Sequence, residues 1–202
     1  MSLPCPDARI KYGNDRFQKN LCPLKLDYYK PGVFMSENQQ PEEKYVRPTW
    51  DEYFMEVART IAKRATCDRG RSGCVIARDN QILVTGYVGS PAGLPHCDDV
   101  GHLMRKMIHA DGSITQHCVR TVHAEQNAIC QAAKKGISIA GGTVYCRMTP
   151  CRTCAMLLIN CGIVRVVCEK HYHDENDSLE MFRTAGIKIE HLEDSLQTYE
   201  NM

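Results

Sequence analysis

The alternation of apolar and polar positions predicts the first regular elements from residue 49 onward. The segment Thr49-Trp50-Asp51-Glu52 fits a helix capping box, and apolar side chains then recur at helical spacing through Phe54 and Ile61. Two short apolar runs, Cys74–Ala77 and Ile82–Thr85, follow with four polar residues between them. Short β-rich runs joined by a polar turn are typical of a hairpin, so the pattern predicts one helix followed by two antiparallel strands.

Farther along, helical and strand patterns alternate. Glycines that can end helices follow three of the helical segments. Such alternation indicates parallel strands covered by helices on both faces, so with the hairpin the chain is predicted to be an α/β protein of order α-β-β-α-β-α-β-α-β. The predicted elements are a helix at His123–Lys135, a strand at Thr143–Cys146, a helix at Cys151–Cys161, a strand at Val164–Cys168, a helix at Ser178–Ala185 and a strand at Ile187–Leu192.

Two stretches lack such a pattern. Residues 1–48 are rich in Pro, Asn, Gln and charge without sustained helix or strand periodicity, and we interpret them as an N-terminal arm or extension. Residues 87–119 form a long polar insertion between the hairpin and the next helix. The expected organisation is an arm at 1–48 and one catalytic domain at 49–202.

Composition narrows the class of partner. The chain has 25 Lys and Arg residues and 24 Asp and Glu residues, so it lacks the excess of basic residues that is typical of proteins that bind DNA or RNA. This balance is more consistent with a small substrate. No apolar run approaches the roughly 18 residues of a membrane helix, and the first residues lack the features of a signal peptide. We therefore expect no membrane partner and a cytoplasmic location, in which the 12 cysteines serve in metal binding or burial rather than disulfides.

One group of residues carries hydrolytic zinc chemistry. His123, Cys151 and Cys154 supply one imidazole and two thiolates, and three protein ligands leave the fourth position of a tetrahedral zinc ion open for water. Glu125 is close enough to handle protons without ligating the metal. This H-x-E and P-C-x-x-C pattern, with Pro150 before the first cysteine, is a signature of zinc nucleobase deaminases. Taken singly, His123 could be a core or capping histidine and Glu125 a first-turn acid, but the paired cysteines favour the metal site.

Three segments carry a resemblance to a known family. Residues 123–129 read His-Ala-Glu-Gln-Asn-Ala-Ile, residues 86–93 read Gly-Tyr-Val-Gly-Ser-Pro-Ala-Gly, and residues 172–174 read Tyr-His-Asp. From about Thr49 to Leu192 the chain closely resembles the deoxycytidylate (dCMP) deaminases of the cytidine deaminase superfamily. The resemblance implies a three-layer α/β/α sandwich around a five-stranded mixed sheet, and a hydrolase that converts dCMP and water to dUMP and ammonia for thymidylate synthesis. It also implies a homo-oligomer, hexamer or dimer, with dCTP and dTTP as allosteric effectors.

The substrate contacts are less defined. Val88 stands where the family usually has Asn, so another cytosine nucleotide, such as dCTP or a modified one, or a base in RNA remains an alternative substrate. Asn127, which tRNA adenosine deaminases generally lack, favours the nucleotide. A monophosphate needs donors, and candidates are Arg69, Lys170 and, preferred because they flank the expected pocket strands, Arg71 and Ser90. The residues expected to bind substrate are Arg71, Ser90, Asn127 and Tyr172.

A second set of soft ligands lies outside the catalytic group. Some phage and bacterial relatives carry a second zinc in the insertion, and on that resemblance Cys67, Cys97, His102 and Cys118 are expected to close a structural site, with His96 and His117 as possible replacements. The alternative is a set of buried free cysteines with surface histidines. A third hypothesis for the whole chain is a non-catalytic zinc module used for assembly, against which Glu125 argues.

Overall fold

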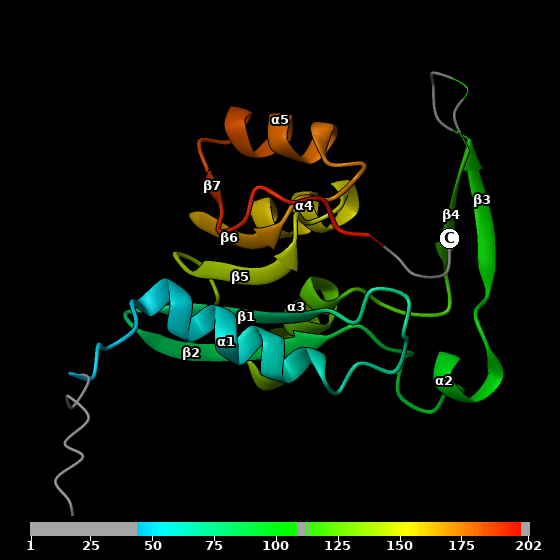
Figure 1. The fold of residues 1–202 in the computed structure, drawn as a ribbon, viewed down its shortest axis with the longest axis horizontal. Coiled ribbons are helices and arrows are strands. Elements are labelled where there is room, and N and C mark those ends of the chain that lie inside the picture. Colours follow the sequence, from blue (N-terminus) through cyan, green and yellow to red (C-terminus); the bar gives the residue numbers. More distant parts are fainter. Residues whose placement is uncertain (1–43, 109–111, 113, 199–202) are drawn as a thin grey trace, which may run out of the picture. The chain divides into compact units, whose positions relative to one another are not determined.

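A mixed five-stranded sheet, in the order β2-β1-β5-β6-β7, is the centre of the described part of the chain (Figure 1). β1 (Gly73–Arg78) runs antiparallel to β2 (Gln81–Tyr87) and to β5 (Thr143–Met148). β5, β6 (Arg165–Lys170) and β7 (Lys188–His191) run parallel. The initial hairpin is thus confirmed, and its first strand joins it to the parallel half of the sheet.

The computed structural model describes residues 44–108, 112 and 114–198. The predicted arm at 1–48 therefore lies outside the described residues except for 44–48, which are exposed and irregular. The arm stays a prediction.

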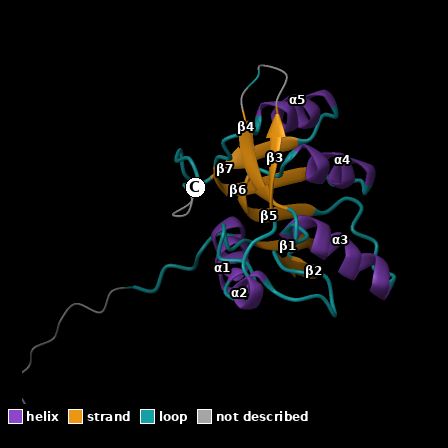
Figure 2. Ribbon diagram, turned by 90° about the vertical axis from the view of Figure 1, so that its right-hand side faces the viewer, coloured by secondary structure: helices purple, strands orange, loops and turns teal. Residues whose placement is uncertain are grey.

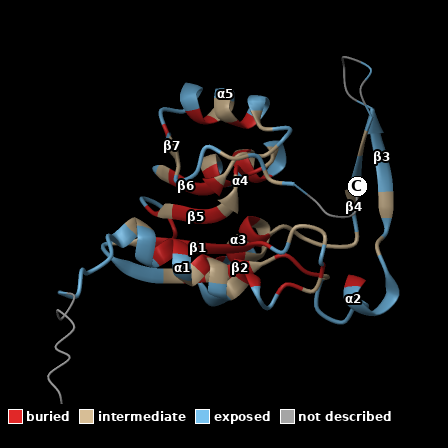
Figure 3. Ribbon diagram, in the orientation of Figure 1, coloured by how far each residue is buried: buried red, intermediate tan, exposed pale blue. Residues whose placement is uncertain are grey.

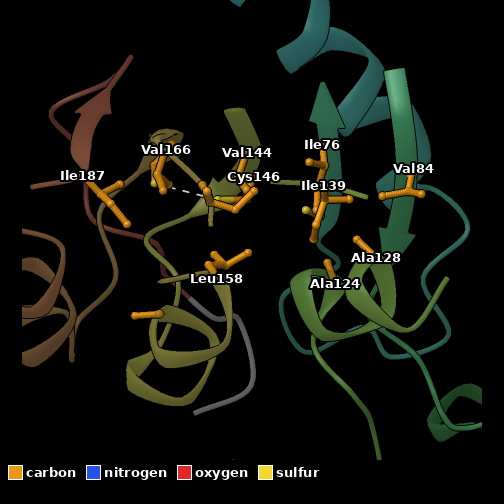
Figure 4. Packing of buried hydrophobic residues seen from close by; sticks show 14 of the residues in the cluster. Ile76, Val84, Ala124, Ala128, Ile139, Val144, Cys146, Leu158, Val166 and Ile187 are labelled. Carbon is orange, nitrogen blue, oxygen red and sulfur yellow. Dashed lines mark hydrogen bonds between the residues drawn. The ribbon is translucent and has the colours of Figure 1, made fainter. Parts of the chain in front are cut away.

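Helices cover both faces of the sheet (Figure 2). α1 (Trp50–Ala62) packs on one face, and α3 (Ala124–Lys135), α4 (Arg152–Asn160) and α5 (Asn176–Thr184) pack on the other. Successive residues of a strand point to opposite faces of the sheet. One face buries Val75, Tyr145 and Val167 against α1. On the other face, Ile76, Val144 and Val166 pack against the other three helices (Figure 4). The predicted α/β/α sandwich is confirmed.

The first helix begins where the sequence predicts. The Thr49 N–H donates to Glu52 Oε2 at 2.7 Å, and the Glu52 N–H donates to Thr49 Oγ1 at 3.3 Å, which completes the capping box. Among the described helices, none combines the length and apolar character needed to cross a bilayer.

The polar insertion contains structure that the sequence pattern did not predict. It forms a short helix, α2 (Cys97–Val100), and a two-stranded antiparallel hairpin of β3 (Met104–Ile108) and β4 (Ile114–Cys118). Most residues of this hairpin are exposed (Figure 3). Without a buried face the strands need no alternation of apolar and polar residues, which is the signal from which a strand is recognised.

Two predicted helix starts are shifted by one residue. His123 and Cys151 are the N-caps of α3 and α4, with extended backbone, and lie outside the first turns in which the sequence placed them. Cap positions are poorly defined by apolar periodicity because the cap side chain leaves the helical path. The consequence for the site is that both side chains project beyond their helices.

The absence of a side chain at Gly86 allows α3 to lie directly on β2. A Cβ atom at Gly86 would lie 2.2 Å from the carbonyl oxygen of Ala124 and 2.4 Å from the Ala128 nitrogen. Both neighbours are backbone atoms of α3, which cannot move without moving the helix. Gly86 therefore sets the distance between β2 and the helix that carries His123 and Glu125.

We expect Gly86→Ala to lower the free energy of unfolding by about 1–3 kcal/mol, because the added methyl group overpacks a backbone contact. Urea unfolding followed by circular dichroism measures the change. Gln81→Ala, an exposed site in the same strand, is the control and should be near neutral. Equal stability of Gly86→Ala and the control would contradict the role of this contact.

Candidate active site

The N-terminal ends of α3 and α4 bring the predicted catalytic zinc ligands together. His123 Nδ1 lies 3.4 Å from Cys151 Sγ and 3.5 Å from Cys154 Sγ, and one ligand atom from each residue lies within 4.8 Å of the other two. Sulfur and nitrogen ligands of a tetrahedral zinc ion are roughly 3.6 Å apart, given Zn–S near 2.3 Å and Zn–N near 2.0–2.1 Å. The donor set and its spacing therefore fit zinc, with Nδ1 as the nitrogen that faces the metal position.

The three groups strongly influence each other's protonation. The pKa of Cys151 is lowered to about 4, mainly by a hydrogen bond from the Cys154 thiol, with a further contribution from His123. The pKa of His123 is raised to about 9, chiefly by its hydrogen bond with Cys151. The pKa of Cys154 is raised, first by the Cys151 thiolate and then by burial. A metal ion binds thiolates and neutral imidazole, so metal binding at this cluster would displace the protons that these groups share.

Glu125 is buried beside this cluster, with 6% of its surface exposed. Cys154 Sγ lies 3.6 Å from Glu125 Oε2. Burial raises the pKa of Glu125, and the nearby His123 opposes that effect. A carboxyl group with a raised pKa, next to a metal position, is suited to accept and return protons during a reaction.

A pocket opens over the cluster. His123, Glu125 and Cys151 line it together with Val88, Thr149 and Tyr172. Arg69, His117 and His173 also line it, and the His117 and His173 rings are 6.4 Å apart. The pocket therefore joins the cluster to walls from β4, from the loop after α1 and from the loop after β6.

The substrate-binding residues expected from the sequence do not all line this pocket. Tyr172 does. Arg71 instead donates to the Ala65 carbonyl at 2.5 Å and pairs with Asp98 at 3.1 Å, outside the pocket lining. Asn127 donates to the Tyr87 carbonyl at 2.9 Å and so ties α3 to the end of β2.

Ser90 and Lys170, which the sequence also offers as phosphate ligands, do not line the pocket either. Ser90 has an Oγ that is buried without a hydrogen-bond partner among the described residues, and Lys170 is 3.7 Å from Glu193. Arg69, which the sequence ranked lower, does line the pocket and donates to the Gln116 carbonyl at 2.8 Å. Sequence reasoning missed the wall formed by Gln116 and His117 because it did not predict β4.

The second cysteine and histidine cluster is also brought together. Cys67, Cys97, His102 and Cys118 have ligand atoms within 4.8 Å of one another. Cys67 Sγ is 3.6 Å from His102 Nδ1, and Cys97 Sγ is 3.6 Å from Cys118 Sγ, again close to tetrahedral spacing. His96 and His117 are not members of the cluster.

A carboxylate supports the histidine of this second cluster. His102 Nε2 lies 3.0 Å from Asp68 Oδ1, which leaves Nδ1 to face the thiols. Carboxylates in this position fix the orientation of metal-bound histidines. Cys67 and Cys118 also line the catalytic pocket, so the cluster and the pocket share residues.

Comparison with known proteins agrees with this geometry. Residues 48–170 match the family described as "Cytidine and deoxycytidylate deaminase zinc-binding region". The chain belongs to this family. It is 38% identical over 147 residues to ComE operon protein 2 of Bacillus subtilis, covering 73% of each chain. It is 34% identical over 143 residues to the deoxycytidylate deaminase of Schizosaccharomyces pombe, covering 71% of this chain but 44% of the relative, so it spans less than half of that protein.

A solved structure shares the fold. The dCMP deaminase of cyanophage S-TIM5, in complex with dCMP and dUMP, superposes with a TM-score of 0.58 at 25% identity and covers 73% of this chain and 100% of that one. The family and the fold that the sequence predicted are therefore confirmed. Members of this family are zinc-binding deaminases, and the catalytic cluster lies within the matched residues.

We expect Cys154→Ala to lose the zinc ion of the catalytic cluster, because one of its three protein ligands is removed. Metal analysis of the purified variant measures this. Cys130→Ala changes an exposed cysteine on α3 and serves as the control that keeps full metal content. Full occupancy of the catalytic cluster in Cys154→Ala would refute the ligand assignment.

Cys97→Ser should reduce the metal content from about two zinc ions per chain to about one and lower thermal stability, because the insertion loses a cross-link between separate segments. Turnover should fall indirectly, since β4 forms a wall of the pocket. His96→Ala should keep both ions, because His96 lies outside the cluster. One zinc per chain in fully loaded wild-type protein would eliminate the second site.

Proposed function

We propose that the protein catalyses zinc-dependent hydrolytic deamination of dCMP to dUMP and ammonia. The observation that carries the proposal is the buried Glu125 against the His123, Cys151 and Cys154 cluster at the base of a pocket. The family match supports deamination as the reaction. Support for dCMP comes from the relatives named deoxycytidylate deaminase and from the related structure that holds dCMP and dUMP.

In this proposal each residue has a defined task. His123, Cys151 and Cys154 hold the zinc ion, which when bound supplies an acidified water molecule as the nucleophile. Glu125 accepts a proton from that water and delivers it to the ring nitrogen N3. Glu125 then accepts the second proton from the hydroxyl group added at C4 and passes it to the amino group, so that the oxygen of water remains as the C4 carbonyl and the nitrogen leaves as ammonia. Burial keeps the carboxyl group of Glu125 suited to both transfers, because it raises the pKa.

The phosphate is assigned to Arg69 in this proposal. Among the described residues, Arg69 is the arginine that lines the pocket, whereas the Arg71 side chain pairs with Asp98 and donates to the Ala65 carbonyl. A guanidinium group can bind phosphate oxygens through two parallel hydrogen bonds. His117 and His173 line the same pocket and add polar side chains to it, whereas the side chain of Val88, which also lines it, is apolar.

Two alternatives remain as competing functions. A different cytosine nucleotide or an RNA base is favoured by Val88, which lines the pocket and offers no hydrogen bond at a position where the family usually has Asn. A non-catalytic zinc module is disfavoured by Glu125, since a scaffold has no need for a buried acid beside the metal. Assembly into a homo-oligomer and regulation by dCTP and dTTP belong to the proposal for dCMP.

Glu125→Gln should leave the catalytic zinc bound but reduce turnover by about 10²–10⁴-fold, because glutamine keeps the size of the side chain and cannot accept the proton. Ammonia release and metal analysis on the same preparation measure both effects. Glu180→Gln, an exposed glutamate on α5, is the matched control. Residual activity within about tenfold of wild type would contradict the proton-transfer role.

The substrate is tested with CMP, dCMP, dCTP, cytidine and deoxycytidine. If dCMP is the substrate, loss of its 5′-phosphate should cost several kcal/mol in kcat/KM, because the donors built for it are left unpaired. Arg69→Ala should reduce the ratio of kcat/KM for dCMP to kcat/KM for deoxycytidine. Equal rates of the wild-type protein on those two substrates would rule out dCMP. If Arg71→Ala reduces the ratio and Arg69→Ala does not, Arg71 is the residue that binds the phosphate.

A further inference from the structure

A third group of polar side chains lies behind the pocket, at the ends of β6 and β7. It consists of His171, Glu175 and His191, and Glu175 is the N-cap residue of α5. His171 Nδ1 lies 2.6 Å from Glu175 Oε1, and the two imidazole rings are stacked with centroids 3.8 Å apart and 15° between their planes. No motif in the sequence marks these three residues as a group.

The ring geometry argues against a metal ion in this group. An imidazole nitrogen directs its lone pair within the plane of the ring. Two rings stacked face to face therefore direct their lone pairs side by side and do not aim them at a common point, unlike the ligands of a metal ion. The short contacts instead describe a hydrogen-bonded network centred on the Glu175 carboxylate.

The network has a defined direction for each hydrogen bond. An ionised carboxylate only accepts, so Thr149 Oγ1, the Tyr172 N–H at 3.0 Å and His171 Nδ1 all donate to Glu175. Because Thr149 donates its proton to Glu175, its oxygen accepts from His191 Nε2 at 2.9 Å. Burial opposes ionisation of Glu175, but the hydrogen bonds from Thr149, Tyr172 and His171 outweigh it, and the pKa of Glu175 is lowered.

Two of these donors are walls of the pocket. Thr149 and Tyr172 both line it, and Thr149 lies two residues before Cys151. They come from the ends of different strands, β5 and β6, and share the same carboxylate oxygen of Glu175. The backbone already joins these segments, since the Thr149 N–H donates to the Lys170 carbonyl at 3.2 Å, and the Glu175 side chain adds a second link that reaches the Thr149 hydroxyl group and the Tyr172 N–H.

We propose that Glu175 is a positioning residue for the deamination site, because it holds Thr149 and Tyr172 next to each other in the pocket wall. The claim rests on the proposed function for its effect on turnover, while its effect on local order is independent of any substrate. Glutamine at this position keeps the shape but removes the charge that strengthens these hydrogen bonds, and its N–H₂ group must face either the Thr149 and Tyr172 donors or the His171 donor. Valine at Thr149 keeps the shape of threonine and removes the hydroxyl group.

The test is a double-mutant cycle of Glu175→Gln and Thr149→Val in the zinc-loaded full chain. Each single variant should lower kcat/KM for the best substrate of the nucleotide panel by about 10- to 100-fold, in the range of outer-shell partners of metal sites. The double variant should be no slower than the slower single variant, because both changes break the same link. The proposal would be overturned if the fold reduction in kcat/KM of the double variant equals the product of the reductions of the two single variants. It would also be overturned if kcat/KM is unchanged in Glu175→Gln.

Hydrogen exchange measured by mass spectrometry gives a second result that needs no activity. Peptides covering 147–154 and 170–174 should exchange faster in both single variants, while peptides from α1 and β1 stay as in wild type and Glu180→Gln changes neither. Faster exchange throughout the sheet would show a general loss of stability and overturn the positioning role.

Metal analysis of His191→Ala tests the competing role of a third metal site. Loss of about one zinc ion in this variant would overturn the positioning role in favour of that site. If wild-type protein deaminates none of the nucleotides, the proposed function fails and exchange alone decides the role of Glu175.

Discussion

The site depends on one constraint, which is that the N-terminal ends of two helices must meet at the same point beside the sheet. α3 supplies His123 and Glu125, and α4 supplies Cys151 and Cys154. Gly86 lets α3 lie against β2 at backbone contact, and Asn127 ties the same helix to the Tyr87 carbonyl. His123 Nδ1 lies 3.4 Å from Cys151 Sγ and 3.5 Å from Cys154 Sγ, and a small displacement of either helix would separate these atoms. The Glu125 carboxyl group would then also move away from the metal position.

Around that point the pocket is assembled from loops that have little core of their own. The exposed hairpin β3–β4 contributes Gln116 and His117, and the second cluster connects the end of β4 to α2 and to the loop after α1. On the other side, Glu175 connects the ends of β5 and β6. Contacts among polar, cysteine and histidine side chains thus join segments that have little apolar packing of their own, and a two-stranded hairpin is at best marginally stable alone.

Much of this could be predicted from the sequence, because the signals are local. The capping box at Thr49, the alternation of strands and helices, and the spacing of His123, Glu125, Cys151 and Cys154 each depend on neighbours in the chain. The hairpin β3–β4 was missed because its strands bury no face. The sequence favours Arg71 over Arg69 because Arg71 directly flanks a strand that is expected to line the pocket. The pairing of Arg71 with Asp98, which engages its guanidinium group elsewhere, is a contact between residues 27 positions apart. The same holds for Glu175, whose partner Thr149 is 26 positions away.

The account is tested most directly by incubating dCMP with the zinc-loaded protein in water enriched in heavy oxygen and analysing the products by mass spectrometry. Hydrolytic deamination predicts dUMP that carries the heavy-oxygen label at C4, with ammonia released in equal amount. Neither product should form with protein stripped of metal. Recovery of unchanged dCMP from the zinc-loaded protein, or formation of dUMP without the label, would contradict the proposal that this site uses water to deaminate dCMP.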